Sequence, residues 1–149
     1  MNKISVFHNK CKQYHLKVTP QRTAIFSILA EDDSHPSADE IFKKIQQKFP
    51  HISFDTVNRT LLTFAEIGLI DLAEGHGTPR RFDTNLQPHH HFFCLKCGQL
   101  TDFDCKACDD LKIPEKIRSK FLINSQRVVL KGICDTCRTN EPAKQPEPE

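Results

Sequence analysis

Cysteine and histidine are the residues of this chain best suited to metal or redox chemistry. The 149 residues include 7 Cys and 8 His, and three Cys pairs have two residues between the thiols. This spacing lets both thiols of a pair point at one ion, and two pairs complete the tetrahedral four-cysteine site typical of structural zinc. We predict that one structural Zn²⁺ is bound by Cys94, Cys97, Cys134 and Cys137.

The middle pair, Cys105 and Cys108, leaves this assignment open. It could replace either of the other pairs, form a second metal or redox site, or be incidental. A redox dithiol is the main alternative to zinc at such a pair, and a thiol-redox protein is therefore one candidate function. Cys11 stands alone, and we predict no metal role for it.

A histidine triplet directly precedes the first cysteine pair. In a strand, His89 and His91 would share one face while His90 points away. Two imidazoles on one face form half of a site for Fe, Mn, Zn or Ni, and a mixed nitrogen and oxygen site is more labile than a thiolate site, as a sensor requires. One candidate is a regulatory metal site in which His35, Asp83 and Asp102 complete the ligand set of His89 and His91; the alternative is a histidine triplet in an ordinary surface loop.

An enzyme is the competing interpretation of the same residues. A zinc enzyme could use His89 and His91 with a carboxylate and a water. No residue is clearly placed as a general base, and no substrate pocket can be inferred, so we expect neither catalysis nor a small-molecule substrate.

Three helices and a hairpin are expected before these ligands. Thr19-Pro20 and the capping box of residues 37–40 begin the first two helices, and a third helix begins near residues 53–55 and ends at Gly68. Residues 69–72 and 80–83 read as strands around a turn at 75–79. This order indicates a winged helix-turn-helix, with residues 55–67 as the recognition helix.

The remainder predicts a second small domain. Short strands are expected at residues 91–94, 99–104 and 127–133, and a short helix at 114–121. The fold class is therefore α+β, with an N-terminal winged helix-turn-helix and a small α/β domain. The predicted parts are a DNA-binding domain at 1–84, a hinge at 85–88, a zinc-containing domain at 89–140 and a disordered tail at 141–149.

Charge and hydropathy favour nucleic acid over a membrane as the binding partner. The net charge is only +2, but residues 1–30 carry five Lys or Arg and no acid, which favours contact with nucleic-acid phosphates. No run approaches the ~20 apolar residues of a membrane span, and no secretory signal is visible. We expect a cytoplasmic protein without a membrane partner.

Five motifs now stand in order along the chain. They are residues 19–22 (TPQR), 35–40 (HPSADE), 55–61 (DTVNRTL), 89–98 (HHHFFCLKCG) and 132–137 (GICDTC). With these motifs the chain resembles the ferric uptake regulator family of bacterial metal-dependent repressors. The resemblance implies a homodimer that binds double-stranded DNA at an inverted-repeat operator, and the second domain would be the dimerisation domain. The predicted zinc and regulatory ligands match the family's residue by residue.

Asp102 bears on what is sensed. The peroxide-sensing branch of the family has Asp at this position, whereas iron sensors commonly have Glu. The resemblance implies regulatory Fe²⁺ or Mn²⁺, with peroxide acting by oxidation of a ligating His that releases the operator. A plain iron repressor is the alternative, and Asp83 disfavours zinc sensing because the zinc-sensing branch usually has Cys near that position.

The chain departs from the family at three places. Asn58 replaces the usual Tyr of the recognition helix, and Asn can pair bidentately with adenine. Gln126 replaces the His of the family's third metal site, which would leave His90 and Asp109 as a weakened site. The third departure is the Cys105/Cys108 pair, which falls where acidic residues are usual.

Residues with DNA-binding roles are expected on three elements. Thr56, Asn58 and Arg59 would read bases from the recognition helix. Lys17 and Arg22 would approach phosphates or the minor groove, and phosphate contacts from the wing would come from Arg80 and Arg81.

Overall fold

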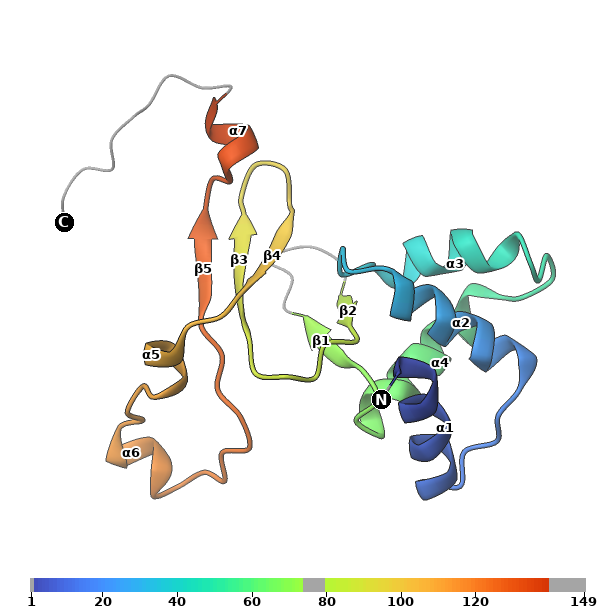
Figure 1. Cartoon of the computed structure of the whole chain (residues 1–149), viewed down its shortest axis with the longest axis horizontal. Helices are drawn as coiled ribbons and strands as arrows, with labels where there is room; N and C mark the ends of the chain where they lie inside the picture. Colours follow the sequence, from blue (N-terminus) through green and yellow to red (C-terminus); the bar gives the residue numbers. More distant parts are fainter. Residues whose placement is uncertain (1, 74–79, 140–149) are drawn as a thin grey trace. The chain divides into compact units, whose positions relative to one another are not determined.

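The computed structural model describes residues 2–73 and 80–139, and the chain divides into two compact units, Met1–Leu86 and Gln87–Glu149 (Figure 1). The fold is α+β, with an N-terminal winged helix-turn-helix followed by a small α/β domain. Two sequence predictions, the turn at 75–79 and the disordered tail at 141–149, lie outside the described residues. In the part of the chain that is described, no helix is long and apolar enough to cross a membrane.

The first unit contains four helices and an antiparallel hairpin. They are α1 (Lys3–Gln13), α2 (Pro20–Glu31), α3 (Ala38–Gln46), α4 (Phe54–Glu66), β1 (Asp71–Ala73) and β2 (Arg81–Asp83).

Local sequence signals begin and end the last three helices. The hydroxyl of Thr19 accepts a hydrogen bond from the amide of Arg22 at the start of α2, and Ser37 forms the predicted capping box with Glu40. At the end of α4, Gly68 has a φ of +72°, which a residue without Cβ adopts at little cost. The amide of the next residue, Leu69, donates to the carbonyl of Phe64, completing a Schellman motif. The predicted helix starts are confirmed.

Helix α1 was not predicted, and the expectation of only three helices before the hairpin is wrong. Its apolar residues are sparse, but Phe7 and Cys11 lie on one face and are fully buried. The ring of Phe7 stacks on Phe26 of α2 at 4.9 Å and meets the edge of Phe64 of α4 at 5.8 Å. The basic N-terminal segment is therefore part of the core of this unit.

The second unit is a three-stranded sheet with short helices. Its elements are β3 (His90–Cys94), β4 (Leu100–Phe103), α5 (Lys106–Asp109), α6 (Glu115–Arg118), β5 (Val129–Gly132) and α7 (Asp135–Thr139). Strand β3 is central, with β4 antiparallel on one side and β5 parallel on the other. Short helices α5 and α7 were not predicted, whereas the other elements lie where the sequence placed them within a few residues.

Candidate metal centres

Four cysteine thiols gather where β3 and β5 end side by side. Cys94 is the last residue of β3 and pairs with Gly132 of β5 in the parallel ladder, which brings the two chain ends together. Cys97 follows in a tight knuckle, in which Gly98 has a φ of +75°. The thiols lie within 4.8 Å of one another, and they are Cys94, Cys97, Cys134 and Cys137. Four sulfurs at this separation fit a tetrahedral Zn²⁺.

The electrostatics of this cluster also suit a cation. Amide hydrogen bonds, first from Cys97 and then from Cys134, lower the pKa of the Cys94 thiol to about 6. A hydrogen bond with the Cys134 side chain, followed by burial, raises the pKa of Cys137 to about 12, so this thiol keeps its proton among the neighbouring sulfurs. A divalent cation removes this conflict, since metal-bound thiols are all deprotonated.

The remaining cysteine pair stays outside the four-thiol cluster. Cys105 and Cys108 are joined by a disulfide, and neither belongs to a metal-ligating group among the described residues. The geometry therefore favours Cys134 and Cys137, rather than this pair, as the partners of Cys94 and Cys97. Spacing could not decide it, because all three pairs have the same two-residue gap.

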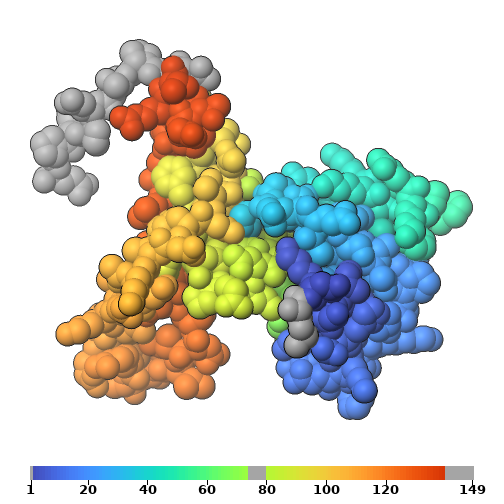
Figure 2. All heavy atoms as spheres, viewed as in Figure 1, coloured from blue at the N-terminus to red at the C-terminus, as the bar shows by residue number. Residues whose placement is uncertain are grey.

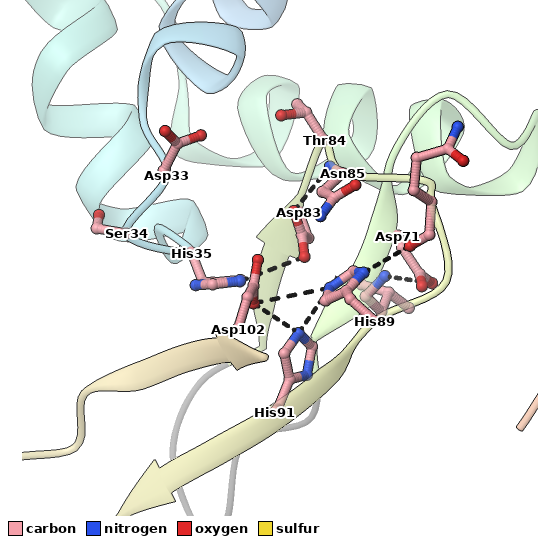
Figure 3. Close-up of polar contacts among 12 residues, drawn as sticks. Asp33, Ser34, His35, Asp71, Asp83, Thr84, Asn85, His89, His91 and Asp102 are labelled. Carbon is pink, nitrogen blue, oxygen red and sulfur yellow. Dashed lines mark hydrogen bonds and ion pairs between the residues drawn. The ribbon is translucent and has the colours of Figure 1, made fainter. Parts of the chain in front are cut away.

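In the second unit, His89, His91 and Asp102 point toward one another (Figure 3). The Nε2 atoms of His89 and His91 lie 2.9 Å apart. A carboxylate oxygen of Asp102, the cross-strand partner of His91, lies 3.2 Å from the nitrogen of His91 and 3.7 Å from that of His89. Two imidazole nitrogens and one carboxylate oxygen are a donor set that fits Fe²⁺ or Mn²⁺.

The tautomer of His89 supports this role. Its Nδ1 lies 2.7 Å from the carbonyl oxygen of Gln87, which can only accept, so Nδ1 carries the proton. The lone pair of Nε2 then faces His91 and Asp102. A backbone carbonyl that orients a histidine in this way is the usual outer partner of a metal-binding imidazole.

In the first unit, His35 and Asp83 form a second pair of donors. The Nε2 atom of His35 lies 3.2 Å from a carboxylate oxygen of Asp83 at the end of β2, and both side chains are buried (Figure 3). His35 has a φ of +57°, an uncommon conformation for a residue other than glycine. The amide of Phe82 donates to the carbonyl of Pro36 at 3.1 Å, which holds the His35 segment beside β2.

Sequence reasoning missed the residues that support the His35 loop. Asp32, at the end of α2, accepts hydrogen bonds from the amide and hydroxyl of Ser34, and Lys44 of α3 donates to it at 2.6 Å. Burial of Asp32 opposes its charge, but the Lys44 and Ser34 hydrogen bonds outweigh burial and lower its pKa to about 2. The signal in the sequence was Asp followed two residues later by Ser, which is typical of an Asx turn.

His90 points away from His89 and His91, as the strand alternation predicted. Its Nδ1 accepts the amide hydrogen of Val128 at 2.9 Å, so Nε2 carries the proton and donates to Asp109 at 2.8 Å. The side-chain amide of Gln126 donates to the backbone carbonyl of Asp109 at 2.6 Å. Both ring nitrogens of His90 and the side-chain amide of Gln126 are therefore engaged in hydrogen bonds with Val128 and Asp109.

The predicted DNA-binding residues lie on the expected elements of the first unit. Thr56, Asn58 and Arg59 are in the first half of α4, where the exposed Arg59 pairs with Asp55 at 3.0 Å. The guanidinium of Arg22 donates to the carbonyl of Lys17 at 2.6 Å. The hairpin carries the exposed Arg80 and the half-buried Arg81.

Comparison with known proteins identifies the class. The model of the ferric uptake regulator family matches residues 13–131. The peroxide-responsive repressor PerR of Staphylococcus epidermidis is 34% identical over 123 residues, which are 83% of this chain and 82% of that protein. The structure of the Campylobacter jejuni peroxide stress regulator is 30% identical, covers 87% of this chain and 97% of its own, and has a TM-score of 0.65. The Helicobacter pylori ferric uptake regulator, at 23% identity and a TM-score of 0.73, covers 91% of both chains and shares the fold.

The chain belongs to the ferric uptake regulator family. It is a metal-dependent, DNA-binding repressor that acts as a dimer, and it is not an enzyme. This result excludes the alternative of a zinc enzyme at His89 and His91.

Proposed function

We propose that this chain represses transcription when Fe²⁺ occupies its regulatory site, and that peroxide relieves the repression. The main support is that His89, His91 and Asp102 converge. The Nε2 atom of His91 lies 2.9 Å from Nε2 of His89 and 3.2 Å from a carboxylate oxygen of Asp102. Relatives named for peroxide response support the choice of signal. Bound Fe²⁺ would supply the one-electron chemistry that cleaves peroxide next to an oxidisable imidazole.

We infer that the donor pair of the first unit and the three donors of the second unit serve one ion. His35 and Asp83 come from the first unit, while His89, His91 and Asp102 come from the second. Together the two sets supply two protein donors beyond the three of the second unit, and mixed nitrogen and oxygen donors of this kind suit Fe²⁺ or Mn²⁺. A shared ion would favour one arrangement of the two units and so set the spacing of the recognition helices in the dimer.

The remaining assignments follow the same proposal. Structural Zn²⁺ would be held by Cys94, Cys97, Cys134 and Cys137, in a dimerisation domain of residues 89–140 that a hinge at 85–88 joins to the DNA-binding residues 1–84. The protein would act in the cytoplasm, and its operator would be an inverted repeat in double-stranded DNA. Bases would be read by Thr56, Asn58 and Arg59, and phosphates or the minor groove would be contacted by Lys17, Arg22, Arg80 and Arg81.

Exposed apolar side chains of the second unit suit the dimeric state. Phe121 is 61% exposed and Leu122 is 93% exposed, and Leu111 and Leu130 are also more than one third exposed. Several large apolar residues on one small unit are unusual on a monomer and typical of a surface that a partner covers.

The central test is peroxide release of an operator from the Fe²⁺ and Mn²⁺ forms, followed by gel shift. We expect peroxide to release the Fe²⁺ form and to leave the Mn²⁺ form bound. If Fe²⁺ controls binding but peroxide releases neither form, the chain is a plain iron repressor. No binding to any inverted-repeat operator with either metal would overturn the repressor assignment.

A matched pair of variants localises the chemistry. Asp102→Glu moves a carboxylate in the cluster and should suppress release by peroxide, whereas Asp104→Glu makes the same change at an exposed residue nearby and should not. Equal peroxide sensitivity of the two variants would contradict the role of Asp102.

The shared ion has its own test. Competition with a metal indicator should show one Mn²⁺ per chain in addition to zinc. His35→Ala and His91→Ala should each lower the affinity for this Mn²⁺ by about tenfold or more. Two independent Mn²⁺ ions, each lost in only one variant, would contradict a single shared site.

A further inference from the structure

The Cys105/Cys108 disulfide has no place in the regulatory scheme above. Cys105 is the N-cap of α5 and Cys108 lies one turn later, with their Cα atoms 5.1 Å apart. This separation is within the usual range for a disulfide. Both residues are partly exposed, and the segment that carries α5 and α6 lies at the visible surface of the second unit (Figure 2). In the single chain, a small oxidant can therefore reach the pair from solvent.

The backbone around the pair is held by hydrogen bonds that do not involve sulfur. Asp109 accepts from Nε2 of His90 in β3 at 2.8 Å. The side chain of Gln126 reaches three backbone carbonyls of this segment, at 2.6 Å to Asp109, 3.3 Å to Cys108 and 3.4 Å to Leu111. These contacts would keep the two sulfurs close when the S–S bond is open, so the bond can close again without reordering the chain.

The two sulfurs are not equivalent. The Sγ atom of Cys105 accepts a hydrogen bond from the amide of Cys108 at 3.2 Å. Such an amide stabilises negative charge on sulfur and so favours the thiolate, which is the reactive form of cysteine. Cys105 is therefore the better nucleophile, and Cys108 is placed to resolve the product.

We propose that Cys105 and Cys108 form a reversible redox site that hydroperoxides oxidise and low-molecular-weight thiols reduce, independently of the regulatory metal. The Cys105 thiolate attacks one peroxide oxygen, so that an S–O bond forms, the O–O bond breaks and hydroxide leaves, taking up a proton to become water. The Cys108 sulfur then attacks the sulfenic sulfur, the S–S bond forms, and the S–O bond breaks to release a second water. Overall, two thiols lose two electrons and two protons to one hydrogen peroxide, which is reduced to two waters; an organic hydroperoxide would instead give one alcohol and one water.

In the cellular compartment of a DNA-binding protein, we expect this disulfide to form only when an oxidant is present. DNA-bearing compartments keep thiols reduced, and disulfides found there are usually transient. The oxidised pair would therefore mark exposure to oxidant. Its segment is linked through Asp109 and His90 to β3, the strand that also contains His91.

The test uses the full chain loaded with zinc and Mn²⁺, so that iron chemistry is absent. After reduction and removal of reductant, hydrogen peroxide is added and the protein is examined by intact mass and peptide mapping. We expect a loss of two hydrogen atoms in the peptide that contains Cys105 and Cys108, with zinc retained and the mass restored by dithiothreitol. The Ala107→Ser variant, which leaves both sulfurs in place, should behave in the same way.

Single substitutions test the order of steps. Cys108→Ser should leave a sulfenic acid at Cys105 that dimedone traps, while Cys105→Ser should leave Cys108 unmodified. The reverse labelling pattern would overturn the assignment of the nucleophile.

Two results would overturn the redox site itself. One is oxidation of the zinc cysteines with zinc release while Cys105 and Cys108 stay reduced. The other is a second tightly bound zinc in the reduced protein that is lost in the Cys105→Ser/Cys108→Ser double variant, since the pair would then be a metal site. Neither result bears on peroxide release of the Fe²⁺ form, so the proposed function stands or fails separately.

Discussion

Asp32 gives a quantitative test of how the His35 loop is held. Its carboxylate receives Lys44 at 2.6 Å and the amide of Ser34 at 2.9 Å, and its pKa falls from the ordinary value of 3.8 to about 2. A difference of this size corresponds to at most about 2 kcal/mol of folding stability. Because the side chain of Lys44 is half exposed, solvent screening reduces this figure, and we expect Asp32→Asn to destabilise the first unit by about 1 kcal/mol at pH 7.

The pH dependence follows from the direction of this pKa. Asp32 binds a proton less readily in the folded than in the unfolded chain, so its contribution is fully present above the unfolded value of 3.8. It is lost as the pH falls from there toward 2. The difference between the parent chain and Asp32→Asn should therefore be constant from pH 5 to pH 8.

Urea unfolding followed by tyrosine fluorescence measures this effect in the first unit. The chain has one Tyr and no Trp, and Tyr14 lies at the end of α1. Asp33→Asn is the matched control, because Asp33 is 95% exposed and its pairing distance with Lys3 is 3.8 Å. We expect the control to change stability by less than about 0.5 kcal/mol. Equal losses in the two variants, or a coupling energy near zero between Asp32→Asn and Lys44→Met, would refute the reasoning.

Two other predictions concern the cores of the two units. Phe7→Ala removes a fully buried ring that contacts Phe26 and Phe64, and urea unfolding should show a loss of about 3–5 kcal/mol; a loss below about 1 kcal/mol would mean that α1 does not pack as described. Zinc can be removed with a chelator or by Cys134→Ser. Because structural zinc supplies on the order of 10 kcal/mol of folding free energy, its loss should abolish amide hydrogen-exchange protection in β3 and β5. The unfolding transition of the first unit, followed by Tyr14 fluorescence, should persist. Retained protection in metal-free protein would contradict a structural role for the site.

Local signals predicted most elements of the fold. Thr19, Ser37 and Ser53 cap their helices because a short polar side chain can satisfy amides of the first turn, and this depends only on neighbouring residues. Helix α1 escaped prediction because its stability comes from packing rather than from pattern. Phe7 is buried by Phe26 and Phe64, which are distant in sequence.

The candidate sites show the same division. The strand alternation of His89, His90 and His91 could be predicted, because successive side chains of a strand point to opposite faces. The choice between Cys105/Cys108 and Cys134/Cys137 as partners of Cys94 could not, because it depends on the parallel pairing of β3 with β5. That pairing joins segments about forty residues apart, and only the folded chain reveals it. The support that Asp32 gives to the His35 loop likewise requires Lys44 from another helix.

The parallel pairing of β3 with β5 also bears on the maturation of the protein. One strand, β3, contains Cys94 at its end and His91 near its start, and the amide of His91 donates to the carbonyl of Val128, just before β5. If zinc binding supplies the folding free energy of this sheet, β5 would settle beside β3, and His91 would gain this hydrogen bond, only once zinc is bound. A newly synthesised chain would therefore bind its structural Zn²⁺ before its regulatory metal. In a cell that lacks zinc, the protein would then not respond to iron.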